Sequence, residues 1–287
     1  MIYTLAYILL TAVSFVLIHQ LGVGLPKMLM VLLSTAYAIF FFHVINYKTI
    51  AGAYRKAFRI KKDYAVILIS VLFMWGGSYL IPIYYSPAIQ VFTFMLSICV
   101  WGAFFTYRHT HRTTDLIIFI LCSFILCVFY IIYYQVYPLK SFLIMLFGTL
   151  LTGTAAYVYF WQSQKLLEFQ FTSTEILAIR FWLLLLVPLM LVIEDQSYLL
   201  INWRILGETL LLSCFTLIFP IYCCQKSIEK IGANLHSVLI AITPFVTFLL
   251  EKSVMKTTTN AIGYLSIILA VVIFIPWIRA SLTNSSK

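Results

Sequence analysis

Apolar segments of about 20 residues follow one another along the chain, and most charged residues lie in the short stretches between them. A helix needs about 20 mostly apolar residues to cross the hydrocarbon core of a bilayer. These segments are too long and too uniform to be the roughly 10-residue alternating strands of a membrane β-barrel. We therefore predict an all-α integral membrane protein with ten transmembrane helices, over residues 2–19, 27–46, 64–83, 88–106, 114–136, 141–163, 173–193, 206–226, 234–251 and 261–279.

The composition agrees with this prediction and excludes other classes of protein. Of the 287 residues, 63% are apolar and 10% are charged, and the mean hydropathy is +1.02. Soluble proteins average about 45–50% apolar and about 25% charged residues. A soluble chain of this size could not bury so much apolar surface. A cytosolic enzyme, a disordered chain and a secreted disulfide scaffold are therefore excluded.

The net charge of +10 follows from an uneven distribution of lysine and arginine between alternate loops. Thirteen of these residues lie in one set of loops and termini, five lie in the other set, and Arg180 lies within an apolar segment. Cytoplasmic loops carry the excess of such residues in membrane proteins. We therefore predict a protein of the inner (plasma) membrane with both termini in the cytoplasm, and no nucleic-acid partner. The basic loop 47–63 is interpreted as a segment that rests on anionic headgroups of the lipid bilayer.

The ten predicted helices divide into two halves of five, over residues 1–137 and 138–287. Because five is an odd number, the second half enters the membrane in the opposite direction, as in the inverted repeats of many transporters. Ser86-Pro87 opens the fourth segment and Gly232-Ala233 opens the ninth, 146 residues later. We predict two inverted five-helix repeats from this order of segments.

The second half resembles a known family of transporters. The run Thr174-Glu175-Ile176-Leu177-Ala178-Ile179-Arg180-Phe181, the stretch from Gln225-Lys226 to Gly232-Ala233-Asn234, and Ile242-Thr243-Pro244 are similar to patterns of the drug/metabolite transporter superfamily, in its EamA-like branch. The resemblance covers the layout of the whole chain and the motifs of residues 160–279. It implies export or exchange (efflux) of small polar metabolites, such as amino acids or related compounds, by alternating access through a central cavity.

Arg180 is the charged residue that the predicted topology leaves unexplained. It lies about seven residues into its segment, or roughly 10 Å at 1.5 Å per residue. Polar groups at membrane depth are costly and usually face a cavity or each other. Arg180 is therefore either an anchor for a carboxylate or phosphate of the solute, or a structural residue that pairs with Glu175, pairs with helix-end carbonyls or reaches the cytoplasmic membrane surface.

Aromatic and amide side chains gather in several of the other segments. Rings and amides of this kind can line a cavity for a small ligand, although many aromatic residues of membrane proteins only pack or lie at the interface. Small residues at Gly76, Gly77, Gly148 and Gly153 are expected to allow helices to approach closely. With Arg180, the predicted substrate-binding residues are Trp75, Tyr79, Gln90, Tyr157, Trp161, Tyr222, Gln225 and His236.

Signatures of catalysis and of nucleotide or metal binding are missing from the sequence. There is no P-loop, no nucleophile elbow and no zinc motif. We therefore predict no catalytic residue, no metal and no cofactor, and a secondary transporter rather than an enzyme. The alternative is an integral-membrane enzyme acting on a lipid-linked substrate, for which His109, His111 and Asp115 are the nearest approach to an active site.

Energy coupling and assembly are less constrained. All nine carboxylates lie at or near predicted helix ends or in loops, which argues against a pump for lipophilic cations. Protons remain open as a coupling ion, although no residue of the sequence requires proton coupling. The expected partners are a small-molecule solute and the bilayer, and the chain is expected to act as a monomer or a homodimer.

Overall fold

The computed structural model describes residues 1–22, 24–81, 86–134, 138–255 and 260–284, and all regular structure in them is helical. The junction at Tyr84-Tyr85 between the third and fourth predicted helices lies outside the described residues. The helices are α1 (Ile2–Gly22), α2 (Lys27–Ile45), α3 (Ile50–Arg59), α4 (Lys61–Leu80), α5 (Pro87–Thr110), α6 (Thr113–Tyr134), α7 (Leu139–Glu168), α8 (Ser173–Ile179), α9 (Trp182–Glu194), η2 (Ser197–Leu200), α10 (Trp203–Ser213), η3 (Cys214–Ile218), α11 (Phe219–Leu239), η4 (Ile240–Ile242), α12 (Thr243–Met255) and α13 (Asn260–Asn284).

Eight helical stretches among these residues are long and apolar enough to cross a membrane. One of them, Trp203–Met255, has 53 residues and contains a non-helical residue, Gly232. A further apolar helix covers Asn260–Phe274. The prediction of a multi-pass, all-helical membrane protein is confirmed at this level.

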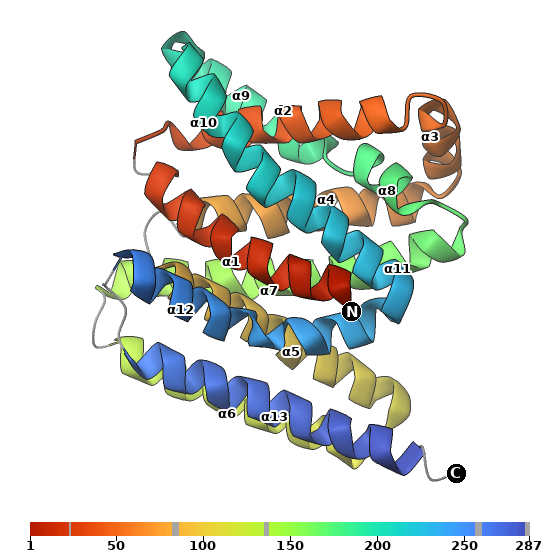
Figure 1. Cartoon of the computed structure of the whole chain (residues 1–287), viewed down its shortest axis with the longest axis vertical. Coiled ribbons are helices and arrows are strands. Elements are labelled where there is room, and N and C mark those ends of the chain that lie inside the picture. Colours follow the sequence, from red (N-terminus) through yellow and green to blue (C-terminus); the bar gives the residue numbers. More distant parts are fainter. Residues whose placement is uncertain (23, 82–85, 135–137, 256–259, 285–287) are drawn as a thin grey trace.

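The helices lie side by side in a layered bundle (Figure 1). Figure 1 shows α6 and α13 along one edge and α2, α9 and α10 along the opposite edge, with α1, α4, α7 and α11 between them. The start of α1, the end of α13, α3 and α8 all lie at the same end of the bundle. The first and last described helices therefore have their terminal ends at the same end of the bundle, as the predicted topology requires.

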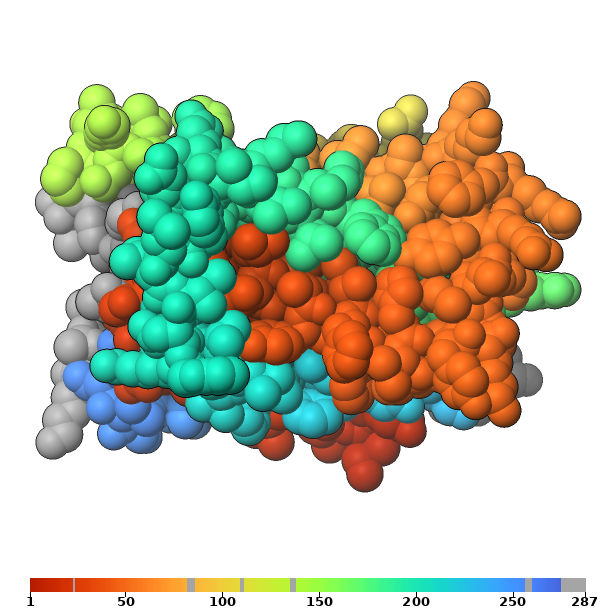
Figure 2. Space-filling view, turned by 90° about the horizontal axis from the view of Figure 1, so that it is seen from above, coloured from red at the N-terminus to blue at the C-terminus, as the bar shows by residue number. Residues whose placement is uncertain are grey.

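Two apolar cores hold the bundle together. One joins side chains of α1, α2, α4, α8, α9 and α11, and the other joins side chains of α6, α12 and α13. Helices α5 and α7 contribute to both cores, since Phe94 and Tyr159 belong to the first and Phe92 and Met145 to the second. The outer faces remain apolar. Phe40, Met190 and Trp203 of α2, α9 and α10 are exposed, as expected of side chains that contact lipid. Figure 2 shows the molecule from the side on which α9 and α10 lie.

Helix α3 lies within the stretch predicted as the basic loop 47–63 and was not itself predicted. Its apolar side is buried through Ala53 and Ala57, while Arg55 and Arg59 are exposed. An amphipathic helix has a low mean hydropathy but a distinct apolar face. The basic segment is thus a helix docked on the bundle and not an irregular loop.

A chain of hydrogen bonds attaches α3 to α9. The Trp182 indole Nε1 donates to the Tyr54 hydroxyl at 2.6 Å, and the Tyr54 hydroxyl lies 2.9 Å from His43 Nε2. Burial raises the pKa of the Tyr54 hydroxyl, which therefore keeps its proton and donates it to His43. His43 Nδ1 is then the protonated nitrogen and donates to the Ile39 carbonyl at 2.8 Å.

Small residues bring helices close together at three of the four predicted glycines. A Cβ at Gly77 would lie 2.1 Å from Thr152 Oγ1, and one at Gly148 would lie 3.0 Å from Ile81 Cδ1. A Cβ at Gly153 would lie 2.3 Å from Ser97 Cβ and 2.9 Å from the Phe94 carbonyl oxygen. The prediction was wrong for Gly76, because nothing lies within 4 Å of its Cβ position.

We expect Gly153→Ala to destabilise the protein by about 1–3 kcal/mol, the usual cost of overpacking. The neighbouring Phe94 carbonyl belongs to the backbone of α5 and cannot move aside without shifting that helix. Thermal unfolding in detergent measures the effect, and Gly76→Ala is the matched control because its Cβ meets open space. Equal unfolding temperatures for the two variants would show that α5 and α7 do not approach as described.

Candidate functional site

A break between α8 and α9 places Arg180 in the interior. Helix α8 begins with a capping box, in which the Thr172 hydroxyl accepts from the Glu175 N–H and the Glu175 carboxylate accepts from the Thr172 N–H. It ends at Ile179, and the helix resumes at Trp182. The Tyr64 hydroxyl donates to the Ile179 carbonyl at 3.0 Å and so satisfies an acceptor at the break.

The Arg180 side chain is completely buried. Its guanidinium carbon lies 4.6 Å from the centre of the Tyr159 ring and 4.8 Å from that of Phe181. None of its three side-chain nitrogens has a hydrogen-bond partner among the described residues. Tyr7 and Cys224 lie close enough to interact with its charge, but neither carries an opposite charge near neutral pH. The guanidinium is therefore buried without a counter-ion among the described residues.

Pairing between Arg180 and Glu175, one of the structural alternatives, is wrong. The Glu175 carboxylate lies 3.3 Å from Lys56 Nζ on α3 and also accepts from the Thr172 N–H. Arg180 lies five positions after Glu175 and directly follows the end of α8 at Ile179. Because Arg180 is buried within the protein, it does not reach the membrane surface either.

Polar side chains from α1, α7 and α11 surround this guanidinium. The Tyr159 hydroxyl donates to Gln225 Oε1 at 2.9 Å, and Gln225 Nε2 has no partner among the described residues. We call the following set the central polar cluster: Thr4, Tyr7, Tyr159, Arg180, Cys224, Gln225, Ser227 and His236.

His236 forms the second half of the central polar cluster. Its Nε2 lies 3.3 Å from Cys224 Sγ and its Nδ1 lies 2.8 Å from Ser227 Oγ, which in turn lies 2.7 Å from Thr4 Oγ1. The imidazole packs between the rings of Tyr7 and Phe160, each with its centre 5.2 Å away. The histidine is buried and fully hydrogen-bonded, which ties α11 to α1.

Three of the predicted site residues, Arg180, Gln225 and His236, are brought together in the central polar cluster. The structure places the other predicted residues elsewhere. Tyr79 is buried on α4 with its hydroxyl 2.5 Å from Thr216 Oγ1. Tyr222 packs its ring against Tyr3, with the ring centres 6.4 Å apart.

Two further predicted residues are buried with polar atoms that lack partners among the described residues. These atoms are Trp75 Nε1 on α4 and both amide atoms of Gln90 on α5. Tyr157 stacks on Phe105 and Trp161 is 56% exposed, and both line a cavity at the edge of α7.

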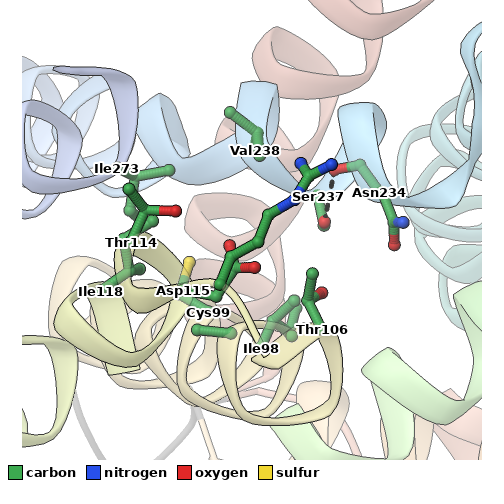
Figure 3. A pocket seen from close by; sticks show the side chains of 13 residues that line it. Ile98, Cys99, Thr106, Thr114, Asp115, Ile118, Asn234, Ser237, Val238 and Ile273 are labelled. Carbon is green, nitrogen blue, oxygen red and sulfur yellow. Dashed lines mark hydrogen bonds between the residues drawn. The ribbon is translucent and has the colours of Figure 1, made fainter. Parts of the chain in front are cut away.

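Two cavities open at the end of the bundle where Gly232 lies. The first, of about 320 Å³, lies between α5, α6, α11 and α13 and is drawn in Figure 3. The second, of about 350 Å³, lies between α7 and α11 and includes Phe160 in its wall. Both reach Asn234 and Ser237, and neither includes Arg180. The ring of Phe160 separates the second cavity from His236, so the central polar cluster is closed from this side.

Gly232 interrupts α11 just before the residues of that helix that line these cavities. Its φ of +79° and ψ of 160° belong to a region that is essentially restricted to glycine. The residue interrupts the helical conformation of α11, and the next N–H, that of Ala233, donates to Gln164 Oε1 at 3.0 Å. The ninth helix was predicted to begin at Gly232-Ala233, and the structure has this break inside α11, where residues 227–231 are helical and not a loop.

We expect Gly232→Ala to destabilise the protein by about 1–3 kcal/mol, because a Cβ is strained at this φ and ψ. The variant should also lose the angle between the two parts of α11. Gly207→Ala in α10 is the control, since its Cβ meets nothing within 4 Å and should be neutral or mildly stabilising. Thermal unfolding of both variants, without added denaturant, measures the difference. If Gly232→Ala unfolds at the same temperature as the unsubstituted protein, α11 is not interrupted at Gly232.

Of the three residues considered for an enzyme site, two have side chains that the structure describes. His111 is exposed at the end of α5, Asp115 lines the first cavity, and the side chain of His109 lies outside the described residues. Among the described residues, no three His, Cys, Asp or Glu side chains are grouped to hold a metal ion. No protein family model and no curated protein sequence matches this chain.

Proposed function

We propose that this protein is a secondary transporter of small polar metabolites, acting as an exporter or exchanger by alternating access. The carrying observation is the buried Arg180 guanidinium with no hydrogen-bond partner among the described residues. An uncompensated ion inside a bundle costs several kcal/mol, and intramembrane ions generally mark solute or ion pathways. The central polar cluster is the proposed solute site, as the resemblance to EamA-like transporters suggests.

The proposed architecture has ten transmembrane helices. The stretch Trp203–Met255 would be about 80 Å long as one straight helix, at 1.5 Å per residue, more than twice the roughly 30 Å of the hydrocarbon core. Its break at Gly232 supports two crossings. With α13 as a further crossing, the eight stretches become ten.

Helix neighbours support the proposal of two inverted repeats. In that proposal α1, α2, α4, α5 and α6 correspond to α7, α8–α9, α10–α11, α12 and α13. Helix α1 packs on α11 and α12, and α7 packs on the corresponding α4 and α5. Likewise α6 packs on α5 as α13 does on α12. The packed pairs α2–α9, α5–α12 and α6–α13 each join two corresponding helices, so exchanging the halves leaves each pair unchanged. A two-fold exchange of the halves thus preserves the main contacts.

The proposed orientation puts both termini and α3 in the cytoplasm. It rests on the excess of lysine and arginine in the loops at that end. A phosphatase or fluorescent reporter fused after Lys287 measures the orientation. We expect fluorescence without phosphatase activity, because the phosphatase acts only outside the cytoplasm. Phosphatase activity without fluorescence would show that the C-terminus lies outside the cytoplasm and that the proposed orientation is wrong.

Counterflow in proteoliposomes tests the proposed function. Vesicles holding the purified full-length chain are loaded with unlabelled amino acids, nucleosides or organic acids, and uptake of the labelled compound is followed. We expect a transient accumulation for at least one class, absent from protein-free vesicles. Folded protein that gives no counterflow with any member of the panel would overturn the transporter proposal.

A further inference from the structure

The unpartnered atoms around Arg180 are hydrogen-bond donors. The three guanidinium nitrogens and Gln225 Nε2 have no acceptor among the described residues. The acceptor of the Gln225 amide is already used by the Tyr159 hydroxyl at 2.9 Å. A group that satisfies this part of the cluster must therefore bring acceptor oxygens rather than donors.

The charge of the cluster is a single positive one. Arg180 is the one lysine or arginine that is fully buried within the described part of the chain. The two buried carboxylates there are engaged elsewhere: Glu175 with Lys56 and the start of α8, and Glu251 with Ser86 and the Ala88 N–H. A ligand with one negative charge neutralises this guanidinium. A dianion would keep one negative charge buried without a partner, which is costly.

The geometry of the guanidinium favours a planar anion. A guanidinium and a carboxylate form two parallel hydrogen bonds in one plane. The rings of Tyr159 and Phe181 cover the guanidinium at 4.6 and 4.8 Å, which leaves its N–H edge for such a partner. The rings of Tyr7 and Phe160 pack on His236, so further aromatic surface adjoins the central polar cluster.

No charged partner for an ammonium group lies in this cluster. Both buried carboxylates of the described residues are already engaged elsewhere, so the ammonium group of a zwitterion would have no carboxylate to pair with here. Building on the transporter proposed above, we propose that the central polar cluster binds a small organic monocarboxylate with an apolar body and no ammonium group. Arg180 holds the carboxylate and the Gln225 amide donates a further hydrogen bond to it.

Compounds built on one carbon skeleton test this proposal. They are 3-phenylpropanoate, its neutral amide, the zwitterion phenylalanine and the cation phenethylamine, with acetate and inorganic phosphate as smaller anions. Each is added to the detergent-purified full chain at pH 7.4, and binding is measured by thermal shift and by calorimetry, since a ligand of the folded state raises the unfolding temperature. Arg180→Lys and Arg180→Met are measured in parallel.

We expect 3-phenylpropanoate to bind at least tenfold more tightly than its amide, phenylalanine or phosphate. The preference should fall in Arg180→Lys, which keeps the charge but not the planar fork, and should vanish in Arg180→Met. Equal binding of acid and amide, stronger binding of phenylalanine or phosphate, a preference that persists in Arg180→Met, or no stabilisation by any carboxylate would each overturn the proposal.

This experiment separates the two proposals. Binding in detergent does not depend on transport. If the carboxylate binds through Arg180 but the counterflow panel gives no signal, the anion site stands and the transporter proposal fails. If counterflow occurs with no preference for carboxylates, the transporter proposal stands and the anion site fails.

Discussion

Arg180→Met should abolish solute binding without destabilising the fold. A buried charge that loses its partner costs about 2–5 kcal/mol, so affinity should fall roughly 30- to 4,000-fold at 1.4 kcal/mol per tenfold. Stability should respond in the opposite direction. The guanidinium has no partner among the described residues, and replacing buried ions by apolar side chains of similar volume is often neutral or stabilising by about 1–4 kcal/mol.

The two readouts separate a binding role from a structural one. The unfolding temperature and the affinity for the best ligand are measured on the same preparation. Arg204→Met is the control, because the Arg204 side chain is 83% exposed and forms a surface pair with Glu208, and exposed ion pairs add little to stability. A loss of about 3–5 kcal/mol in Arg180→Met, as expected for a broken buried pair, would assign Arg180 a structural role.

Glu251→Ala should have the largest effect on stability. The Glu251 carboxylate, on α12, is completely buried and accepts from the Ser86 hydroxyl and from the Ala88 N–H, both at 2.6 Å. It thereby fixes the start of α5 against α12. Each hydrogen bond to a charged group contributes about 1.5–3 kcal/mol, so the loss should be about 3–6 kcal/mol.

Thermal unfolding in detergent measures this loss. The control is Glu194→Ala, whose carboxylate is exposed at the end of α9, and it should change stability by less than about 0.5 kcal/mol. The unfolding temperature of Glu251→Gln should lie between those of Glu251→Ala and Glu194→Ala, because the glutamine amide keeps one acceptor oxygen. If Glu251→Ala and Glu194→Ala unfold at the same temperature, Glu251 does not join the two helices.

Much of the fold could be predicted from the sequence because the bilayer imposes a fixed length on apolar segments. Most predicted segments agree with helices to within a few residues, as for 27–46 with α2 and 114–136 with α6. The break after α8 could not be predicted, since Arg180 and Phe181 are not residues that interrupt helices by themselves. Pro188 shows the converse, because it lies inside α9 without ending that helix.

The predicted site was recovered only in part, for a related reason. Arg180, Gln225 and His236 stand out in a sequence because polar residues are rare in apolar segments. Tyr159 and Cys224 do not stand out, since the chain has 19 tyrosines and 6 cysteines, and their role depends on which helices pack together. Glu251 lies near a helix end, as predicted, but its burial arises from the packing of α12 on α5.

Access to Cys224 tests the central claim most directly. This native thiol lies within the central polar cluster and is 2% exposed. In a variant whose other five cysteines are replaced by serine, proteoliposomes are treated with a membrane-impermeant methanethiosulfonate from the outside or from the lumen. Alternating access predicts that Cys224 is modified from either side and that a bound carboxylate slows both reactions. Modification from one side only, or from neither, would contradict it.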